Sequence, residues 1–190
     1  GENVSVCAIE GNFDDAQSSV KQIFTDSEVK AELARHNFMF SSANSINWGR
    51  LLPQIVYYMY AYLELVRTEK VSLGEPMDVV VPTGNFGNIL AAYYARKMGL
   101  PIRKLVCASN ANKVLTDFIR TGTYDRRREF YATSSPSMDI LISSNLERLL
   151  YDLSGEDSLM LASWMKDLAE TGVYTVNDAV KAKVQELFYG

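Results

Sequence analysis

The sequence has 190 residues, of which 47% are hydrophobic and 22% are charged. This length and balance predict one soluble globular domain that can bury a full core without disulfides or metals. The net charge of -4 gives no electrostatic footprint for nucleic acid, and no apolar run has the length and uniformity of a membrane span.

The two cysteines are expected to be free, reduced thiols, and neither they nor the single histidine suggest a metal or catalytic site. Cys7 and Cys107 each lie in a short apolar run, Val4–Ile9 and Leu105–Ala108, so we expect both thiols to be buried in strands. Buried, reduced cysteines of this kind favour a cytoplasmic protein. We expect no signal peptide before the first predicted strand. No metal-ligand spacing is present, and His36 is predicted to end a helix rather than to catalyse a reaction.

The first third of the chain predicts a strand, two helices and a polar loop. The apolar run Val4–Ile9 favours a short strand, and a turn is expected at residues 10–12, with Asn12 as the cap of the next helix. Helices follow over residues 13–24 and from residue 26 or 27 to residue 34. Small polar residues at 41–47 then precede a long amphipathic helix from Trp48 to Val66. Pro53 lies within that helix, where it predicts a kink or a new first turn.

Two strand–turn–helix units occupy the middle of the chain. The valine-rich run Met77–Val81 predicts a strand buried on both faces, and Ile102–Ala108 predicts the next strand. Helices are expected over residues 88–98 and 113–120, and the second is closed by Gly122. Consecutive units of this kind require right-handed crossovers between parallel strands. We therefore expect an α/β fold with a doubly wound, mainly parallel sheet, helices on both faces and a C-terminal helical layer.

The last part of the chain predicts helices at the edge of this fold. We expect a single α/β domain over residues 1–190, in which residues 144–190 form peripheral helices. Ser144 and Glu147 have the spacing of a capping box. Further helices are predicted over residues 158–169 and 176–188, capped by Asp157 or Ser158 and by Thr175.

The turn Pro82–Asn88 joins the valine-rich strand to the next helix. Such a turn directs several backbone N–H groups and the positive end of the helix dipole at one place, which suits a phosphate. Gly84 and Gly87 would permit positive φ and a close approach, and Asn88 would lie near the N-cap. The turn lacks the glycines of a dinucleotide fingerprint and the lysine of a P-loop, so an ordinary βα turn explains it equally well.

Four stretches of the sequence occur together in a specific order and spacing: Glu10–Gln17, Asn44–Trp48, Pro82–Asn88 and Ser135–Ile140. In this combination they resemble the threonine synthase family, whose members are pyridoxal-phosphate enzymes of the tryptophan-synthase-β fold type. The resemblance runs from about residue 4 to residue 150. It implies that the chain is most of the large cofactor-binding lobe of a longer enzyme, which converts O-phosphohomoserine and water to threonine and phosphate with pyridoxal 5'-phosphate as its cofactor.

The resemblance also implies which residues form the site. The backbone N–H groups of the glycine-bearing turn would bind the cofactor phosphate, in agreement with the shape predicted for that turn. These cofactor-binding candidates are Gly84, Asn85, Phe86, Gly87 and Asn88. The polar loop before the long helix would face the substrate, although helix capping also explains its composition. The substrate-side candidates are Asn44, Ser45 and Asn47.

We expect the lysine that forms a Schiff base with the cofactor to lie outside this chain. Lys21, Lys30 and Lys70 precede the phosphate turn, but they occupy predicted helix-surface or loop positions. The segment that contacts the pyridine nitrogen is expected beyond Gly190. Because this chemistry needs both groups, we predict that the chain contains no catalytic residue and is inactive alone.

Two alternatives remain open for the sequence. The first is another pyridoxal-phosphate lyase of the same fold type, such as a threonine dehydratase or a relative of cysteine synthase. The second is a non-catalytic α/β module that binds a phosphorylated metabolite or a nucleotide at the same turn. In each case the expected partner is a small molecule, with no nucleic acid, membrane or metal.

Overall fold

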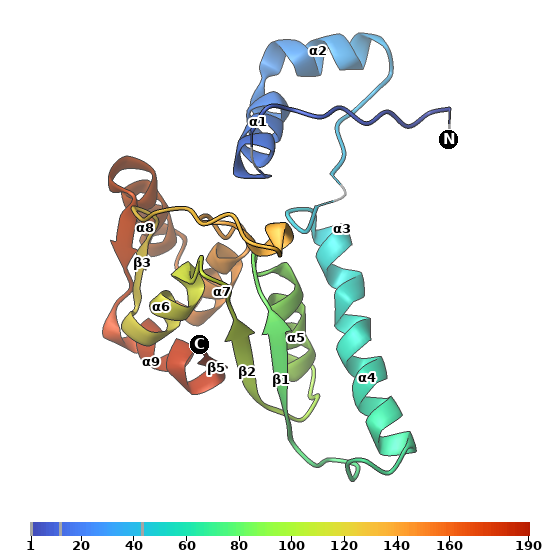
Figure 1. The fold of residues 1–190 in the computed structure, drawn as a ribbon, viewed down its shortest axis with the longest axis vertical. Coiled ribbons are helices and arrows are strands. Elements are labelled where there is room, and N and C mark those ends of the chain that lie inside the picture. Colours follow the sequence, from blue (N-terminus) through green and yellow to red (C-terminus); the bar gives the residue numbers. More distant parts are fainter. Residues whose placement is uncertain (1, 12, 43) are drawn as a thin grey trace. The chain divides into compact units, whose positions relative to one another are not determined.

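The computed structural model describes residues 2–11, 13–42 and 44–190 (Figure 1). The chain divides into two compact units, Gly1–Ser41 and Ser42–Gly190, and each is described by itself. In the described residues, no helix combines the length and the apolar character needed to cross a membrane.

The first unit contains two helices, α1 (Phe13–Thr25) and α2 (Ser27–Arg35). Asp26 caps α2, because its carboxylate accepts hydrogen bonds from the two backbone N–H groups of residues 28 and 29, at 2.8 and 3.0 Å. His36 is the C-cap residue of α2 and forms an exposed pair with Glu32 of the same helix. The predicted second helix and the position of His36 at its end are confirmed.

The predicted strand Val4–Ile9 is wrong. This segment has no regular secondary structure, Val6 is 94% exposed, and Cys7 is exposed as well. A strand is stable only beside a hydrogen-bonded neighbour, and no strand in the described part of the chain pairs with this segment. Of the two cysteines expected in the interior, only Cys107 is buried. The turn predicted at Asn12 lies outside the described residues.

The second unit is built on a parallel sheet with the strand order β1-β2-β5. β1 (Met77–Pro82) pairs with β2 (Ile102–Ala108), and β2 pairs with β5 (Phe188–Tyr189). The connection from β1 to β2 contains α5 (Gly87–Lys97), which packs against both strands. The predicted α/β fold with its parallel βα units is therefore confirmed.

β1 is an edge strand, and its burial alternates along its length. Val81 is 5% exposed and faces the core, whereas its neighbour Val80 is 63% exposed. The prediction that this strand is buried on both faces is wrong, because only one side of β1 is covered in the described part of the chain. A continuous run of valines does not distinguish a central strand from an edge strand.

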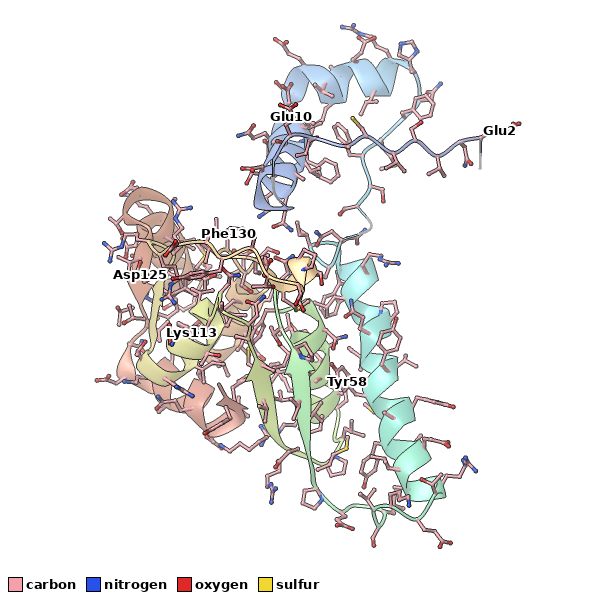
Figure 2. All side chains as sticks on the ribbon, in the orientation of Figure 1. Glu2, Glu10, Tyr58, Lys113, Asp125 and Phe130 are labelled. Carbon is pink, nitrogen blue, oxygen red and sulfur yellow. The ribbon has the colours of Figure 1, made fainter. Side chains whose placement is uncertain are left out.

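The long predicted helix is interrupted at Pro53. It consists of α3 (Trp48–Leu51), a 3-10 turn η1 (Leu52–Gln54) and α4 (Ile55–Arg67). The proline occupies the 3-10 turn, as expected for a residue without a backbone N–H. Figure 2 labels Tyr58 on α4, and this side chain belongs to the buried face of the helix.

The C-terminal part contributes both helices and strands. Its elements are α6 (Val114–Thr121), β3 (Thr123–Asp125), η2 (Pro136–Met138), α7 (Leu146–Leu153), α8 (Ser158–Thr171), β4 (Val173–Thr175) and α9 (Asp178–Leu187). β3 and β4 form an antiparallel pair that the sequence analysis did not predict. Gly122 and Gly172 end α6 and α8 in the left-handed conformation, with φ of 77° and 80°.

Three details of this part differ from the predictions. In the part of the chain that the structure describes, no side chain caps α7, so the capping box expected at Ser144 is not formed there. Asn177 caps α9 in place of Thr175, because Thr175 pairs with Thr123 in the small antiparallel sheet. Phe188 was expected at the end of a helix and instead begins β5 beside β2. In the last two cases, pairing with a distant strand overrides a local helical pattern.

Candidate phosphate-binding site

A pocket of about 220 Å³ lies at the carboxyl end of β1, where α5 begins. Its walls are the turn between these elements and residues from three other segments. The lining residues are Ser45, Gln54, Pro82, Thr83, Gly84, Asn85, Phe86, Gly87, Asn88, Ile89, Ser137 and Met138. All five predicted cofactor-binding residues thus surround one cavity, together with one of the three substrate-side candidates.

Phe86 sets the shape of the turn. It is the N-cap residue of α5 and has φ of 63°, in the left-handed region. Its side chain is 1% exposed, and the centroid of its ring lies 5.5 Å from the ring centroid of Phe188 in β5. The buried ring therefore holds the backbone of the turn in a conformation that residues other than glycine rarely adopt.

The two glycines of the turn are required for close contact rather than for positive φ. Neither Gly84 nor Gly87 has a positive φ, so this part of the prediction is wrong. A Cβ atom on Gly87 would lie 2.5 Å from Ser45 Oγ, and one on Gly84 would lie 3.1 Å from the carbonyl oxygen of Ser137. The close approach in the structure is made by neighbouring segments of the protein, and the predicted approach of a phosphate stays a prediction.

In the described part of the chain, the N-terminus of α5 has no side-chain cap. The first N–H groups of any helix lack partners within the helix, and the helix dipole makes this end positive. In α8 and α9, the side chains of Asp157 and Asn177 accept hydrogen bonds from these groups. At α5 the same groups border a pocket, which is the arrangement that binds anions in many α/β proteins.

The Asn88 side chain is held by the neighbouring helix. It accepts a hydrogen bond from the Tyr58 hydroxyl, and its Nδ2 donates to Gln54 Oε1 at 3.1 Å. Burial raises the pKa of Tyr58 to about 12, so this hydroxyl remains a donor at neutral pH. The asparagine side chain is thus bound to α4 and η1, which leaves its backbone N–H as the group it offers to the pocket.

The polar loop before α3 contributes Ser45 to the pocket. The other two candidates form hydrogen bonds within the loop: Asn44 Oδ1 accepts from the backbone N–H of Ile46 at 3.1 Å, and Asn47 Oδ1 accepts from that of Gly49 at 2.9 Å. Asn47 is the N-cap residue of α3. These two side chains shape the loop and are absent from the described lining of the pocket.

The segment Thr133–Ile140 forms another wall, which sequence reasoning did not assign. Ser137 and Met138 of η2 line the pocket, and the next residue, Asp139, is 4% exposed. The Asp139 carboxylate accepts hydrogen bonds from the backbone N–H and the hydroxyl of Thr133, at 2.7 and 2.8 Å. These bonds hold the wall in place. The stretch Ser135–Ile140 takes part in the family resemblance, which was a signal for this wall, but no role was assigned to it.

No lysine belongs to the described lining of the pocket. The residues that surround it supply backbone N–H groups, hydroxyls and amides. Such groups bind and orient an anionic ligand, but they provide no amine that could attack a carbonyl group.

Comparison with known proteins shows where this combination of fold and turn occurs. No family model matches the chain. A human protein named threonine synthase-like 1 is 50% identical over 189 residues, which cover 98% of this chain and 25% of the human protein. The threonine synthase of Saccharomyces cerevisiae is 42% identical over 188 residues, which cover 94% of this chain and 35% of the yeast enzyme. The chain is homologous to the threonine synthases.

Solved structures of the threonine synthase family support the same relationship. The pyridoxal-phosphate-bound threonine synthase of Brucella melitensis superposes with a TM-score of 0.80 at 41% identity, over 95% of this chain and 36% of that structure. The yeast threonine synthase superposes with a TM-score of 0.77. The chain thus spans about a quarter to a third of the length of these relatives.

Proposed function

We propose that this chain forms part of the cofactor-binding lobe of a pyridoxal-phosphate-dependent threonine synthase, and that its pocket binds the phosphate of the cofactor. One observation carries the proposal: the uncapped N-terminus of α5 borders a pocket, in a chain homologous to the threonine synthases. The Brucella melitensis relative is bound to this cofactor, which supports the assignment.

The residues of the turn fit a phosphate group. The backbone N–H groups of residues 84–88 would donate to the phosphate oxygens, and the dipole of α5 would favour the negative charge. Gly84 and Gly87 bring neighbouring segments close enough to enclose the pocket. Phe86 contributes through its backbone, since its side chain is buried in the core.

We further propose that Ser45 faces the substrate side of the pocket, and that Asn44 and Asn47 hold its loop. The Ser45 hydroxyl would donate to an anionic or polar group of the substrate, O-phosphohomoserine. The two asparagines would act through their hydrogen bonds to the backbone of residues 46 and 49. In this proposal all three substrate-side candidates act in one loop: Ser45 contacts the substrate, and Asn44 and Asn47 hold the loop in shape.

In the proposed whole enzyme, O-phosphohomoserine and water are converted to threonine and phosphate. The bound cofactor would supply an electron sink for this reaction. This chain would bind and orient the phosphate end of the cofactor and enclose part of the site. Because no lysine lies in the described lining, the amine that binds the cofactor aldehyde would come from outside these residues, and the chain alone would be inactive.

A titration tests the proposal. The 190-residue chain is titrated with pyridoxal 5'-phosphate and with pyridoxal, which lacks the phosphate, and binding is followed by fluorescence. We expect the phosphorylated compound to bind at least about tenfold more tightly, because charge-assisted hydrogen bonds contribute on the order of 1.5–3 kcal/mol. Equal affinities would contradict the proposal.

Borohydride reduction tests the position of the amine separately. Treatment of the chain with pyridoxal 5'-phosphate and borohydride, followed by peptide mass analysis, should yield only low, scattered labelling of surface lysines. Stoichiometric labelling of one lysine would contradict the claim that the reacting amine lies elsewhere.

A phosphometabolite-binding module remains the second candidate. The turn offers donors for a phosphate, but these donors do not distinguish one phosphorylated ligand from another. This favours a module that binds a different phosphorylated ligand as the second candidate. Titration with AMP and inorganic phosphate distinguishes the two candidates. Tighter binding of AMP than of pyridoxal 5'-phosphate would favour the nucleotide-binding module.

A further inference from the structure

One buried side chain connects the phosphate turn with the Ser45 loop. Asn145 is 0% exposed and directly precedes α7. Its Nδ2 donates to Ser45 Oγ and to the backbone carbonyl of Asn85, in both cases at 3.0 Å. The backbone N–H of Asn145 donates to the same Asn85 carbonyl at 3.1 Å. Two walls of the pocket that lie far apart in the sequence are therefore joined through a single residue.

Arg148 determines the orientation of the Asn145 amide. Its Nη1 donates to Asn145 Oδ1 at 2.7 Å and to the Ser45 carbonyl at 3.0 Å, while its Nη2 donates to the Ile46 carbonyl. A guanidinium group carries only donors, so the amide oxygen must face it. The amide nitrogen then faces Ser45 and Asn85, and the whole network has one polarity.

This polarity affects what Ser45 offers to the pocket. Because Ser45 Oγ accepts a hydrogen bond from Asn145, its own hydrogen can donate to a ligand. The hydroxyl lies against Gly87, where an added Cβ would approach it to 2.5 Å. Its position is thus set from both sides, by the amide and by the first residue of α5.

A second set of hydrogen bonds supports the turn from the same segment. The Ser143 hydroxyl donates to the Gly84 carbonyl at 3.0 Å, and the Ser144 hydroxyl lies 3.4 Å from Asn85 Oδ1. The residues before α7 therefore contact the carbonyl side of the turn, which leaves its N–H side toward the pocket.

We propose that Asn145 and Arg148 are positioning residues of the phosphate pocket. They hold the Asn85 backbone in the arrangement that binds the phosphate, and they hold the Ser45 hydroxyl in place on the substrate side. This inference rests on the proposed function, because it concerns the same pocket. Neither residue belongs to the described lining, so both act through the residues that they contact.

The test compares variants of this network with a matched surface variant. Arg148→Met removes the donors, Arg148→Lys keeps the charge but loses the planar fork, and Asn145→Asp removes the Nδ2 donor at constant volume. Arg103→Met serves as the control, because Arg103 forms an exposed ion pair with Asp78. For each chain, the affinities for pyridoxal 5'-phosphate and for pyridoxal are measured, together with a thermal unfolding curve.

We expect Arg148→Met and Asn145→Asp to weaken binding of pyridoxal 5'-phosphate by about tenfold or more, since each disrupts charged or buried hydrogen bonds. Arg148→Lys should have an intermediate effect. Pyridoxal binding should be unchanged in all of them, and Arg103→Met should change neither affinity. If Arg148→Met does not fold, Arg148→Lys and Asn145→Asp decide the result.

Two outcomes would overturn the positioning role. Folded variants that keep the wild-type preference for the phosphorylated compound would show that the network does not position the site. Equal losses for both compounds would indicate general structural damage. A wild-type chain without any preference would instead contradict the proposed function, and the positioning role with it.

Discussion

The turns that follow β1 and β2 occupy equivalent places at the carboxyl ends of adjacent parallel strands. They differ in what lies beside them: a pocket at the first turn and a carboxylate of the protein at the second. The first turn, Pro82–Asn88, borders a pocket at the uncapped N-terminus of α5. The second turn, Ser109–Lys113, is filled by the carboxylate of Asp139 from a distant loop. Equivalent topology therefore does not imply an equivalent site.

In the second turn, two asparagine side chains donate hydrogen bonds to a carboxylate of the protein itself. Asn110 Nδ2 and Asn112 Nδ2 donate to Asp139 Oδ1 at 2.6 and 3.1 Å, and the Thr133 backbone N–H donates to Oδ2. These hydrogen bonds, above all the one from the Thr133 backbone, lower the pKa of Asp139. In the residues that the structure describes, no side chain caps the N–H groups at the start of α5, and this difference supports a ligand role for the first turn only.

The largest expected effect concerns the residue that shapes the first turn. Phe86→Ala should destabilise the chain by about 3–5 kcal/mol, because it leaves a cavity in the core where the buried aromatic ring was packed. Urea unfolding measures this change. Glu156→Ala is a matched control, because Glu156 has a similar φ of 65° but an exposed side chain. A cost below about 1 kcal/mol for Phe86→Ala would show that its ring does not anchor the turn.

Gly87→Ala tests the close approach that encloses the pocket. The added methyl group would collide with Ser45, so we expect a loss of stability of about 1–3 kcal/mol and roughly tenfold weaker binding of pyridoxal 5'-phosphate. The double variant Gly87→Ala/Ser45→Gly removes the collision and should recover stability. Unchanged stability of the single variant would exclude the predicted steric conflict.

Asp139→Asn tests the second turn and has a defined pH dependence. Because the folded-state pKa of Asp139 lies below the ordinary value of 3.8, its contribution is present above that pH and is lost as the pH falls further. The variant should lower Tm by about 5 °C at pH 7 and should show a weaker acid dependence. Thermal unfolding between pH 2 and pH 7 measures both.

A matched aspartate controls for surface electrostatics. Asp125 is paired with Arg127, which lowers the pKa of its carboxyl to about 2, but the pair is exposed. Asp125→Asn should therefore change Tm by less than Asp139→Asn at pH 7. An equal change in both variants would argue against a special role for the buried carboxylate.

The smallest expected effect concerns the hydrogen bond that holds the Asn88 side chain. Tyr58→Phe removes the donor to Asn88 and should cost about 1 kcal/mol in urea unfolding. Binding of pyridoxal 5'-phosphate should remain unchanged, because the proposed contact uses the backbone N–H. A marked loss of affinity would instead assign the Asn88 side chain to the site.

The chain is homologous to the threonine synthases, but it covers only part of their length, and this limits what the experiments measure. The chain spans 35% of the yeast enzyme, so the experiments above concern binding and stability of this part. Turnover belongs to the proposed whole enzyme.

Local sequence patterns predicted the central βα units well. The apolar runs of β1 and β2, the helix between them and the stop at Gly122 follow from periodicity and turn chemistry, which act over a few residues. The same reasoning predicted the turn at Pro82–Asn88, which joins β1 to α5 in the structure, and its binding of a phosphate stays a prediction. It failed at Val4–Ile9, because a strand depends on a partner that lies elsewhere in the chain or is absent from it.

The amino-acid sequence by itself determined the order of the strands and helices in the central units and the position of the glycine-bearing turn between β1 and α5. Only the tertiary structure decided why the turn contains glycines, because Ser45 and Ser137 approach them from distant segments. It also decided that Asp139 fills the second turn and that Asn145 supports the first. Periodicity reports contacts within an element, whereas these contacts join residues that only the folded chain brings together.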